Sequence, residues 1–342
     1  MELKSLPSYK SLKNLISLSN QDINFLNSSL KTAKNIFLKN DNKVIVFAGP
    51  CSIHDENSAI IYAKKLRNLQ KNLKNIFIIM RVFFEKARSK NSWRGFLYDP
   101  ELNSSCDIEE GIKKVRRLLI EITKLKVPIC TEFVDPNISS YFDDLITWGF
   151  IGARTSASSL HRHYASSLSI PVGFKNSLDG DLEIPINATT VAKSPQSFVS
   201  IDENGKICNI LSKGNNFSHI VLRGSKTKVN YDDSSLEDAV KKMNFNEIAT
   251  PIVIDCSHGN SQSDHRNQIT AFRHSINSII KNQYPIIGLM LESNLFEGNQ
   301  KTDLLKLRFG LSITDPCIDF ETTGKLLLEA DEMLNKSAIH RN

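Results

Sequence analysis

The chain lacks the features of an exported or membrane-bound protein. Its 342 residues include only six cysteines, at positions 51, 106, 130, 208, 256 and 317, and none belongs to a CxxC pair. A chain of this length can bury a large core without disulfides, so a reducing compartment is the simpler interpretation. The first residues contain no apolar run typical of a signal peptide, and the longest apolar run, Ile286–Leu291, is too short to span a bilayer. We therefore expect a cytoplasmic protein with no membrane partner.

The sequence also lacks a concentrated block of positive charge. Its 43 Lys and Arg residues exceed its 37 Asp and Glu residues by six, and this surplus is spread along the chain. Nucleic-acid-binding proteins usually gather basic residues in runs or patches. The composition is compatible with anionic partners, but we do not expect nucleic acid to be the main one.

No glycine-rich dinucleotide fingerprint follows the first apolar run, which argues against a Rossmann fold. Eight short apolar runs instead recur along the chain, with amphipathic stretches between most of them. The runs are Val44–Ala48, Ile76–Met80, Pro128–Thr131, Phe150–Ala153, Pro171–Phe174, Ile220–Leu222, Ile252–Ile254 and Ile286–Leu291. The clearest amphipathic stretches are Glu56–Leu69, Glu109–Leu125, Ile138–Ile146, Leu236–Lys242 and Ser263–Lys281, and Thr322–Leu334 resembles a final helix. Strands that alternate with helices predict an α/β fold with a parallel sheet, and eight of them favour a (β/α)8 TIM barrel.

Two segments lie outside this repeat. Residues 1–42 precede the first strand, and apolar residues from Leu26 to Phe37 at helical spacing predict a helix there. Residues 197–211 contain two strand-like runs around a turn with Asn204-Gly205, which predicts a β-hairpin inserted between the fifth and sixth barrel strands. We expect residues 43–342 to form the catalytic barrel and residues 1–42 a helical arm. The hairpin is either decoration or an interface.

Chemically active side chains follow the strands. At or just after the end of each predicted strand, in chain order, stand Cys51, Arg81, Glu132, Arg154, Lys175, Arg223, His258 and Glu292. Active sites of β/α barrels are built at the carboxyl ends of the strands. Eight such residues in eight strands predict a functional site at this rim.

The cations of this set predict an anionic substrate. Lys86 and Arg88 follow the second strand and join Arg81, Arg154, Lys175 and Arg223. Several cations in one pocket repel each other unless anions are bound, and guanidinium groups match phosphate and carboxylate geometry. We expect the substrate to carry phosphate, and the site to bind more than one phosphate group.

The remaining residues of the set can bind a metal ion. Cys51, His258, Glu292 and Asp315, from the loop after the last strand, offer sulfur, nitrogen and oxygen ligands. This mixture suits one divalent ion of the Mn, Fe, Co or Zn class rather than Mg or Ca. The alternative is a Cys51 nucleophile paired with His258.

The motifs of the chain resemble a known family, the class I, microbial aromatic-pathway form of 3-deoxy-D-arabino-heptulosonate 7-phosphate (DAHP) synthase. The resemblance extends from about Lys43 to Asp319. It is carried by residues 49–55 (GPCSIHD), 80–81 (MR), 84–89 (FEKARS), 152–155 (GART), 161–162 (HR), 171–176 (PVGFKN), 222–224 (LRG), 255–260 (DCSHGN), 292–294 (ESN) and 297–300 (EGNQ).

The resemblance implies a transferase that condenses phosphoenolpyruvate with erythrose 4-phosphate and water and releases phosphate. This is the first step of the shikimate pathway to chorismate and the aromatic amino acids. It also implies that Cys51, His258, Glu292 and Asp315 hold the metal, and that Arg81, Arg154, Lys175 and Arg223 hold phosphoenolpyruvate. Arg88 and Ser89 would meet the phosphate of erythrose 4-phosphate. Lys86, Glu132 and His258 form the expected catalytic set, with Lys86 supplying a proton and Glu132 assisting the attack of water.

The sequence departs from the family pattern at two places, which bear on sugar-phosphate binding and on feedback by aromatic amino acids. Ala87 stands where the family usually has proline between Lys and Arg, so the loop is less rigid and we expect weaker binding of the sugar phosphate. The arm lacks the acidic tip that helps form the aromatic amino-acid site in related enzymes. We therefore expect feedback by Phe, Tyr or Trp to be weak or lost. The expected assembly is a homodimer or homotetramer.

Two other functions compete with this interpretation. The sister enzyme that makes 3-deoxy-D-manno-octulosonate 8-phosphate shares the barrel, but its loop carries an Asn between Ala and Arg that is missing from Lys86-Ala87-Arg88. A non-catalytic barrel that binds a phosphorylated metabolite would be expected to lose metal ligands or Lys86, and the chain has all of them.

Overall fold

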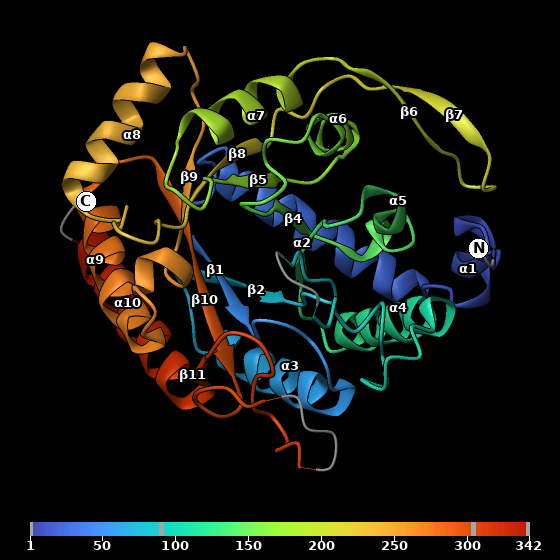
Figure 1. Cartoon of the computed structure of the whole chain (residues 1–342). Helices are drawn as coiled ribbons and strands as arrows, with labels where there is room; N and C mark the ends of the chain where they lie inside the picture. The colour runs from blue at the N-terminus through green and yellow to red at the C-terminus, as the bar shows by residue number, and fades with distance from the viewer. Residues whose placement is uncertain (1–2, 89–91, 302–305, 340–342) are drawn as a thin grey trace.

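A closed barrel of eight parallel strands forms the centre of the molecule, as the computed structural model shows for residues 3–88, 92–301 and 306–339. The strands follow the order β1-β2-β3-β4-β5-β8-β9-β10, and β10 pairs back onto β1. Helices between the strands cover the outside of the barrel (Figure 1). The predicted (β/α)8 TIM barrel is therefore confirmed.

The barrel strands are buried along almost their whole length, as expected for parallel strands covered on both faces. They are β1 (Val44–Gly49), β2 (Ile76–Arg81), β3 (Ile129–Glu132), β4 (Trp148–Ile151), β5 (Val172–Lys175), β8 (Ser218–Leu222), β9 (Ile252–Asp255) and β10 (Ile286–Asn294). A ninth strand, β11 (Ile318–Asp319), pairs with the end of β10.

The helices fill the connections. They are α1 (Tyr9–Leu15), α2 (Asn20–Phe37), α3 (Glu56–Gln70), α4 (Ile108–Lys124), α5 (Pro136–Ser139), α6 (Ser159–Ser167), α7 (Glu183–Lys193), α8 (Asp233–Phe245), α9 (Gln268–Lys281) and α10 (Phe320–Ile339), with short 3-10 turns η1 (Asp143–Leu145), η2 (His258–Ser261) and η3 (His265–Asn267). Aspartate caps start several of them; Asp55, for example, accepts a hydrogen bond from the Ser58 N–H at 2.7 Å. Among the described residues, no helix has the length and apolar character needed to cross a membrane.

Two predicted elements differ from the structure. The fourth strand starts two residues earlier than expected, at Trp148, because this indole is a fully buried part of the barrel core. The helix expected over Ile138–Ile146 is reduced to α5 and η1. Buried Tyr141 and Phe142 lie between these two turns and anchor the short connection to the core, so a continuous helix does not form.

The inserted hairpin has the predicted bounds, β6 (Ser197–Ile201) and β7 (Ile207–Leu211), paired antiparallel. Asp202 Oδ1 accepts hydrogen bonds from the N–H groups of Asn204 and Lys206, at 2.9 and 2.8 Å, and Gly205 adopts a φ of 85°. This turn geometry explains why Asn204-Gly205 predicts a hairpin, because glycine reaches positive φ without steric cost.

The C-terminal end of α2 closes the base of the barrel. Ala33, Ile36 and Phe37 are buried against the apolar side chains of the barrel interior. The ring of Phe37 lies 6.1 Å from that of Trp148 and 5.3 Å from that of Phe217, measured between centroids. Apolar packing at this end leaves the opposite, carboxyl end of the strands as the place for polar chemistry.

We expect Phe37→Ala to lower the free energy of unfolding by about 3 kcal/mol, because it removes a buried ring from a packed core. Denaturant unfolding followed by tryptophan fluorescence measures the change. Phe245→Ala is the matched control, since its ring is 88% exposed. Equal effects of the two substitutions would show that α2 does not stabilise the barrel.

Candidate active site

Charged side chains form a layer above the apolar interior of the barrel. Ile79, Val221, Val253 and Met290 belong to the interior cluster. Side chains of a strand alternate between its faces, so the residue two positions later points to the same side. These residues are, in order, Arg81, Arg223, Asp255 and Glu292, and each is buried. The strand pattern therefore explains why ionic groups gather at the carboxyl end of the barrel.

Arg81 and Glu292 form an ion pair at the bottom of this layer. Arg81 Nη2 donates to Glu292 Oε1 at 2.9 Å, and both side chains are fully buried. The Arg81 guanidinium also lies 4.0 Å from the centroid of the Phe83 ring. Burial alone would raise the pKa of Glu292, but the nearby His258, Arg81 and Lys86 lower it to about 2. Glu292 is therefore a carboxylate at neutral pH.

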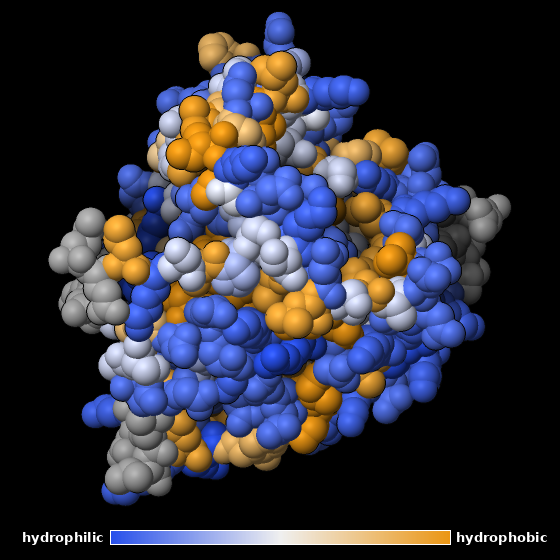
Figure 2. All heavy atoms as spheres, turned by 90° about the vertical axis from the view of Figure 1, so that its right-hand side faces the viewer, coloured by the Kyte–Doolittle hydropathy of each residue, from blue (hydrophilic) through white to orange (hydrophobic). Residues whose placement is uncertain are grey.

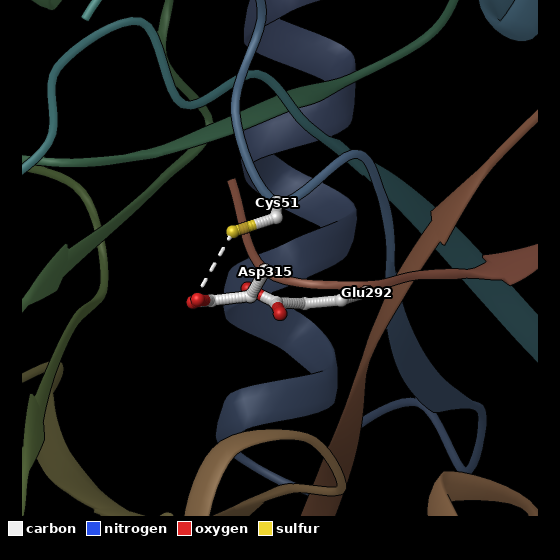
Figure 3. Close-up of side chains that lie close together, drawn as sticks. All are labelled: Cys51, Glu292 and Asp315. Atoms are coloured by element: carbon white, nitrogen blue, oxygen red, sulfur yellow. Dashed lines mark hydrogen bonds between the residues drawn. The ribbon is translucent and has the colours of Figure 1, made fainter. Parts of the chain in front are cut away.

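Three of the four expected metal ligands point toward one another (Figure 3). Cys51 follows β1, Glu292 lies on β10, and Asp315 lies in the loop before β11. One ligand atom from each lies within 4.8 Å of those of the other two, and Cys51 Sγ lies 3.5 Å from Asp315 Oδ2. Thiol, carboxylate and carboxylate donors at this spacing fit a single divalent ion.

His258 lies at the edge of this group. Its Nε2 atom is 3.5 Å from Glu292 Oε1, and its Nδ1 atom is 2.9 Å from Asp255 Oδ2. A carboxylate on one ring nitrogen directs the other nitrogen toward a metal in many metal sites. His258 thus faces the group of Cys51, Glu292 and Asp315 through Glu292, although it is not one of the three residues whose ligand atoms all lie within 4.8 Å of one another.

The surroundings of Cys51 bear on whether it acts as a nucleophile. Its Sγ atom contacts Lys86 Nζ at 3.1 Å and Asp315 at 3.5 Å, whereas His258 contacts Asp255 and Glu292. Burial, followed by the negative charge of Glu292, raises the pKa of the Cys51 thiol to about 12. These surroundings favour a neutral thiol until a cation binds, which disfavours the Cys51–His258 nucleophile pair.

A cavity of about 400 Å³ opens above the charged layer. Seven of the expected site residues line it: Lys86, Arg88, Glu132, Arg154, Arg223, His258 and Asp315. Cys51, Arg81, Lys175 and Glu292 are buried rather than in the wall of this cavity. Ser89 lies outside the described residues. The structure thus brings the expected cations and metal ligands together around one cavity.

Lys86 connects the cavity to the metal ligands. Besides Cys51 Sγ, its Nζ atom donates to the Cys51 carbonyl oxygen at 3.0 Å. Burial acts to lower the pKa of Lys86, but the neighbouring acidic groups, Cys51 and then Glu292, Asp315 and Glu132, raise it above its ordinary value. Lys86 is therefore protonated and available as a proton donor in the wall of the cavity.

Asp255 is a site residue to which the sequence reasoning gave no role. Lys175 Nζ lies 2.8 Å from Asp255 Oδ2, the same oxygen that faces His258. Burial acts to raise the pKa of Asp255, but His258 and Lys175 hold it well below its ordinary value. Its position directly after the apolar run Ile252–Ile254 could have predicted a role in the site, because the other charged residues of the site also follow apolar runs.

A network of three asparagine side chains fixes the backbone around Arg223. Asn176 Oδ1 accepts from the Arg223 N–H at 2.8 Å, and Asn230 Oδ1 accepts from the Gly224 N–H at 2.7 Å. Asn260 Oδ1 accepts from the Asn230 N–H at 2.8 Å. The loops after β5, β8 and β9 are thereby held together, which fixes the backbone at Arg223 and Gly224.

Close backbone approach positions His258. A Cβ atom on Gly259 would lie 2.5 Å from the backbone of Gly224 and Ser225, so the loops after β8 and β9 need glycine at this crossing. His258 itself adopts a φ of 56°. Such strain persists only where the surrounding contacts impose it, and it is common at functional sites.

Comparison with known proteins agrees with this geometry. A sequence model described as the DAHP synthetase I family matches residues 19–328. The chain is 39% identical to the Tyr-sensitive phospho-2-dehydro-3-deoxyheptonate aldolase of Escherichia coli K12, over 95% of the chain and 92% of that protein. It is 40% identical to a phospho-2-dehydro-3-deoxyheptonate aldolase of Corynebacterium glutamicum, over 86% of the chain and 82% of that protein. A solved structure of phospho-2-dehydro-3-deoxyheptonate aldolase from Francisella tularensis SCHU S4 superposes with a TM-score of 0.94, at 41% identity and 98% coverage of both chains. The chain belongs to the DAHP synthetase I family.

Proposed function

We propose that this protein condenses phosphoenolpyruvate with erythrose 4-phosphate and water to give DAHP and phosphate, the first step of the shikimate pathway to the aromatic amino acids. The observation that carries the proposal is the convergence of cations and metal-ligating side chains on one cavity of about 400 Å³ in a barrel of this family. A cavity of this size suits two small phosphorylated substrates.

The cations would hold the two anionic substrates close together. Arg154 and Arg223 in the cavity wall, with Lys175 and Arg81 beneath it, are assigned to phosphoenolpyruvate. Arg88 faces the same cavity and is assigned to the phosphate of erythrose 4-phosphate. Two phosphorylated molecules repel each other in water, and fixed guanidinium groups offset that repulsion at the distance the reaction requires.

Cys51, His258, Glu292 and Asp315 would hold one divalent ion of the Mn, Fe, Co or Zn class. Such an ion supplies Lewis acidity that polarises the aldehyde carbonyl of erythrose 4-phosphate. Asp255 supports this arrangement, because its contact with His258 Nδ1 leaves Nε2 facing the other ligands.

Lys86 and Glu132 are assigned the proton transfers. The enol carbon of phosphoenolpyruvate attacks the aldehyde, and Lys86 gives a proton to the oxygen that becomes negative. Glu132 helps to deprotonate the water that attacks the phosphate-bearing carbon, after which the hemiketal phosphate collapses and phosphate leaves. Gly152 makes room for this carboxylate, since a Cβ atom there would lie 2.2 Å from Glu132 Oε1.

The proposal also includes a homodimer or homotetramer built on the arm and the hairpin. The Lys10 N–H donates to the Glu203 carbonyl oxygen at 2.9 Å, so α1 contacts the hairpin turn. Val199, Ile207 and Leu211 on the hairpin are 69%, 82% and 76% exposed. Figure 2 shows apolar surface among polar side chains on this side of the molecule. Exposed apolar strands of this kind are typical of protein interfaces. Weak or absent feedback by Phe, Tyr or Trp stays a prediction.

We expect the purified protein to release phosphate from phosphoenolpyruvate only when erythrose 4-phosphate is present, and to lose this activity in a metal chelator. Product analysis with arabinose 5-phosphate in place of erythrose 4-phosphate is the control. Faster turnover of the five-carbon sugar would indicate the octulosonate enzyme instead. Binding of either phosphorylated substrate without any turnover would indicate a non-catalytic barrel.

Cys51→Ser is expected to weaken metal binding by more than about tenfold and to lose activity with it, because a thiolate ligand is replaced by a poor one. Titration of the metal against a chelating dye measures the affinity. Cys106→Ser, which changes an exposed thiol, serves as the control. A Cys51→Ser protein that binds metal normally and still fails to turn over would restore the nucleophile interpretation.

Ala87→Pro is expected to lower the KM for erythrose 4-phosphate about two- to fivefold, since proline removes backbone freedom that the loop otherwise loses on binding. Steady-state kinetics with saturating phosphoenolpyruvate measures the KM. An unchanged or higher KM would mean that rigidity of this loop does not limit sugar-phosphate binding.

A further inference from the structure

Glu85 is a buried carboxyl group that the proposed reaction does not use. It directly precedes Lys86 in the connection from β2 to α4, and it is 1% exposed. The Tyr98 hydroxyl donates to Glu85 Oε1 at 3.2 Å. Its second oxygen, Oε2, has no hydrogen-bond partner within the described parts of the chain. A carboxylate in this position would be poorly solvated, whereas a neutral carboxyl group is tolerated at lower cost.

The Glu85–Tyr98 hydrogen bond closes a loop that turns back on itself. The Leu97 N–H donates to the Phe84 carbonyl oxygen at 3.1 Å, so the two ends of the loop run side by side. Gly95, with a φ of 118°, permits the approach, because a Cβ atom there would lie 2.4 Å from the Phe84 carbonyl oxygen. The pair therefore lies at the base of the loop.

The same loop carries two cations that face the cavity. The Lys86 N–H donates to the Arg94 carbonyl oxygen at 2.9 Å, and Arg88 Nε donates to the Trp93 carbonyl oxygen at 3.0 Å. The Arg94 guanidinium lies 3.9 Å from the centroid of the Tyr98 ring. Movement at the base of the loop would therefore displace both Lys86 and Arg88.

Glu85 also faces the loop that follows β3. Burial, and next the negative charge of Asp135, raise the pKa of Glu85 to about 8, while Tyr98 and the peptide groups of Asp135 and Val134 act in the opposite direction. Tyr164, from α6, also lies near this carboxyl group. Arg94 contacts the Tyr98 ring, and the His161 ring lies 2.9 Å from the Val134 carbonyl oxygen. Glu85 is thus neutral at pH 7 and loses its proton as the pH rises above about 8.

We propose that Glu85 is a positioning residue whose side chain, hydrogen-bonded to Tyr98, closes the base of the loop of Lys86 and Arg88 and thereby sets the affinity for the sugar phosphate. This inference rests on the proposed function for the identity of that substrate. Glu85 does not line the cavity. When it ionises, a negative charge with one hydrogen-bond partner is buried at the base of the loop, which weakens the closed arrangement of the two loop ends.

Kinetics from pH 6.5 to 9 test the proposal. Glu85→Ala is expected to raise the KM for erythrose 4-phosphate about tenfold with little change in the KM for phosphoenolpyruvate, because a small displacement of Arg88 weakens one substrate only. In the unmodified protein this KM should rise with a midpoint near pH 8, whereas in Glu85→Gln it should stay low, since the amide mimics the neutral acid. Tyr98→Phe should raise the same KM, and Glu321→Gln, at an exposed position of α10, is the control that should change nothing.

Thermal unfolding without substrates gives a readout independent of activity. The folded-state pKa of Glu85 lies above the ordinary value of 4.5, so the folded protein binds the extra proton. Stability from this group therefore falls as the pH rises from about 4.5 to about 8. The melting temperature of Glu85→Gln should fall less over this range than that of the unmodified protein or of Glu321→Gln.

The kinetic and unfolding results distinguish the role of Glu85, its selectivity for the sugar phosphate, and the proposed function itself. An active protein in which Glu85→Gln and the unmodified chain share the same pH dependence of KM and of melting temperature would overturn the role of Glu85. An equal rise of both KM values in Glu85→Ala would overturn its effect on the sugar phosphate alone. Absence of turnover by the unmodified protein would overturn the proposed function, and with it the substrate named here.

Discussion

The buried ion pair between Arg81 and Glu292 is the interaction on which the rest of the site depends. Transfer of two charges from water into a barrel is costly, and the cost is offset only when each charge has partners in good geometry. Glu292 has them: Arg81 at 2.9 Å, the Ser257 hydroxyl at 2.9 Å and His258 at 3.5 Å. This carboxylate is therefore ionised and fixed before any ligand binds, which is what a metal ligand requires.

The remaining residues divide between rigid strands and loops. Strand residues such as Asp255, Lys175 and Glu292 form a buried layer whose charges compensate each other. Lys86 and Arg88 lie in a loop, whose base a buried carboxyl group, Glu85, closes through its hydrogen bond with Tyr98. A site with a rigid base and a loop-borne wall can bind one substrate on preformed groups and adjust to the other.

Much of this arrangement could be predicted from the sequence, because the position of a residue at the end of an apolar run largely fixes its place in a barrel. Arg81, Arg223 and Glu292 are examples. Contacts between residues far apart in the chain could not be predicted from the sequence in the same way. The contact of Asp255 with Lys175 joins residues 80 positions apart, and the burial of Glu85 depends on the fold of the loop that returns to Tyr98. The helix expected over Ile138–Ile146 was wrong for a similar reason, because packing of Tyr141 and Phe142 overrides helical periodicity.

The most direct test of the central claim is a crystal structure grown with manganese and phosphoenolpyruvate, in which anomalous diffraction locates the metal. The account predicts one manganese peak bounded by Cys51, His258, Glu292 and Asp315, with the phosphoenolpyruvate phosphate on Arg154 and Arg223. A manganese ion bound elsewhere, or phosphoenolpyruvate bound outside the cavity above the charged layer, would contradict it.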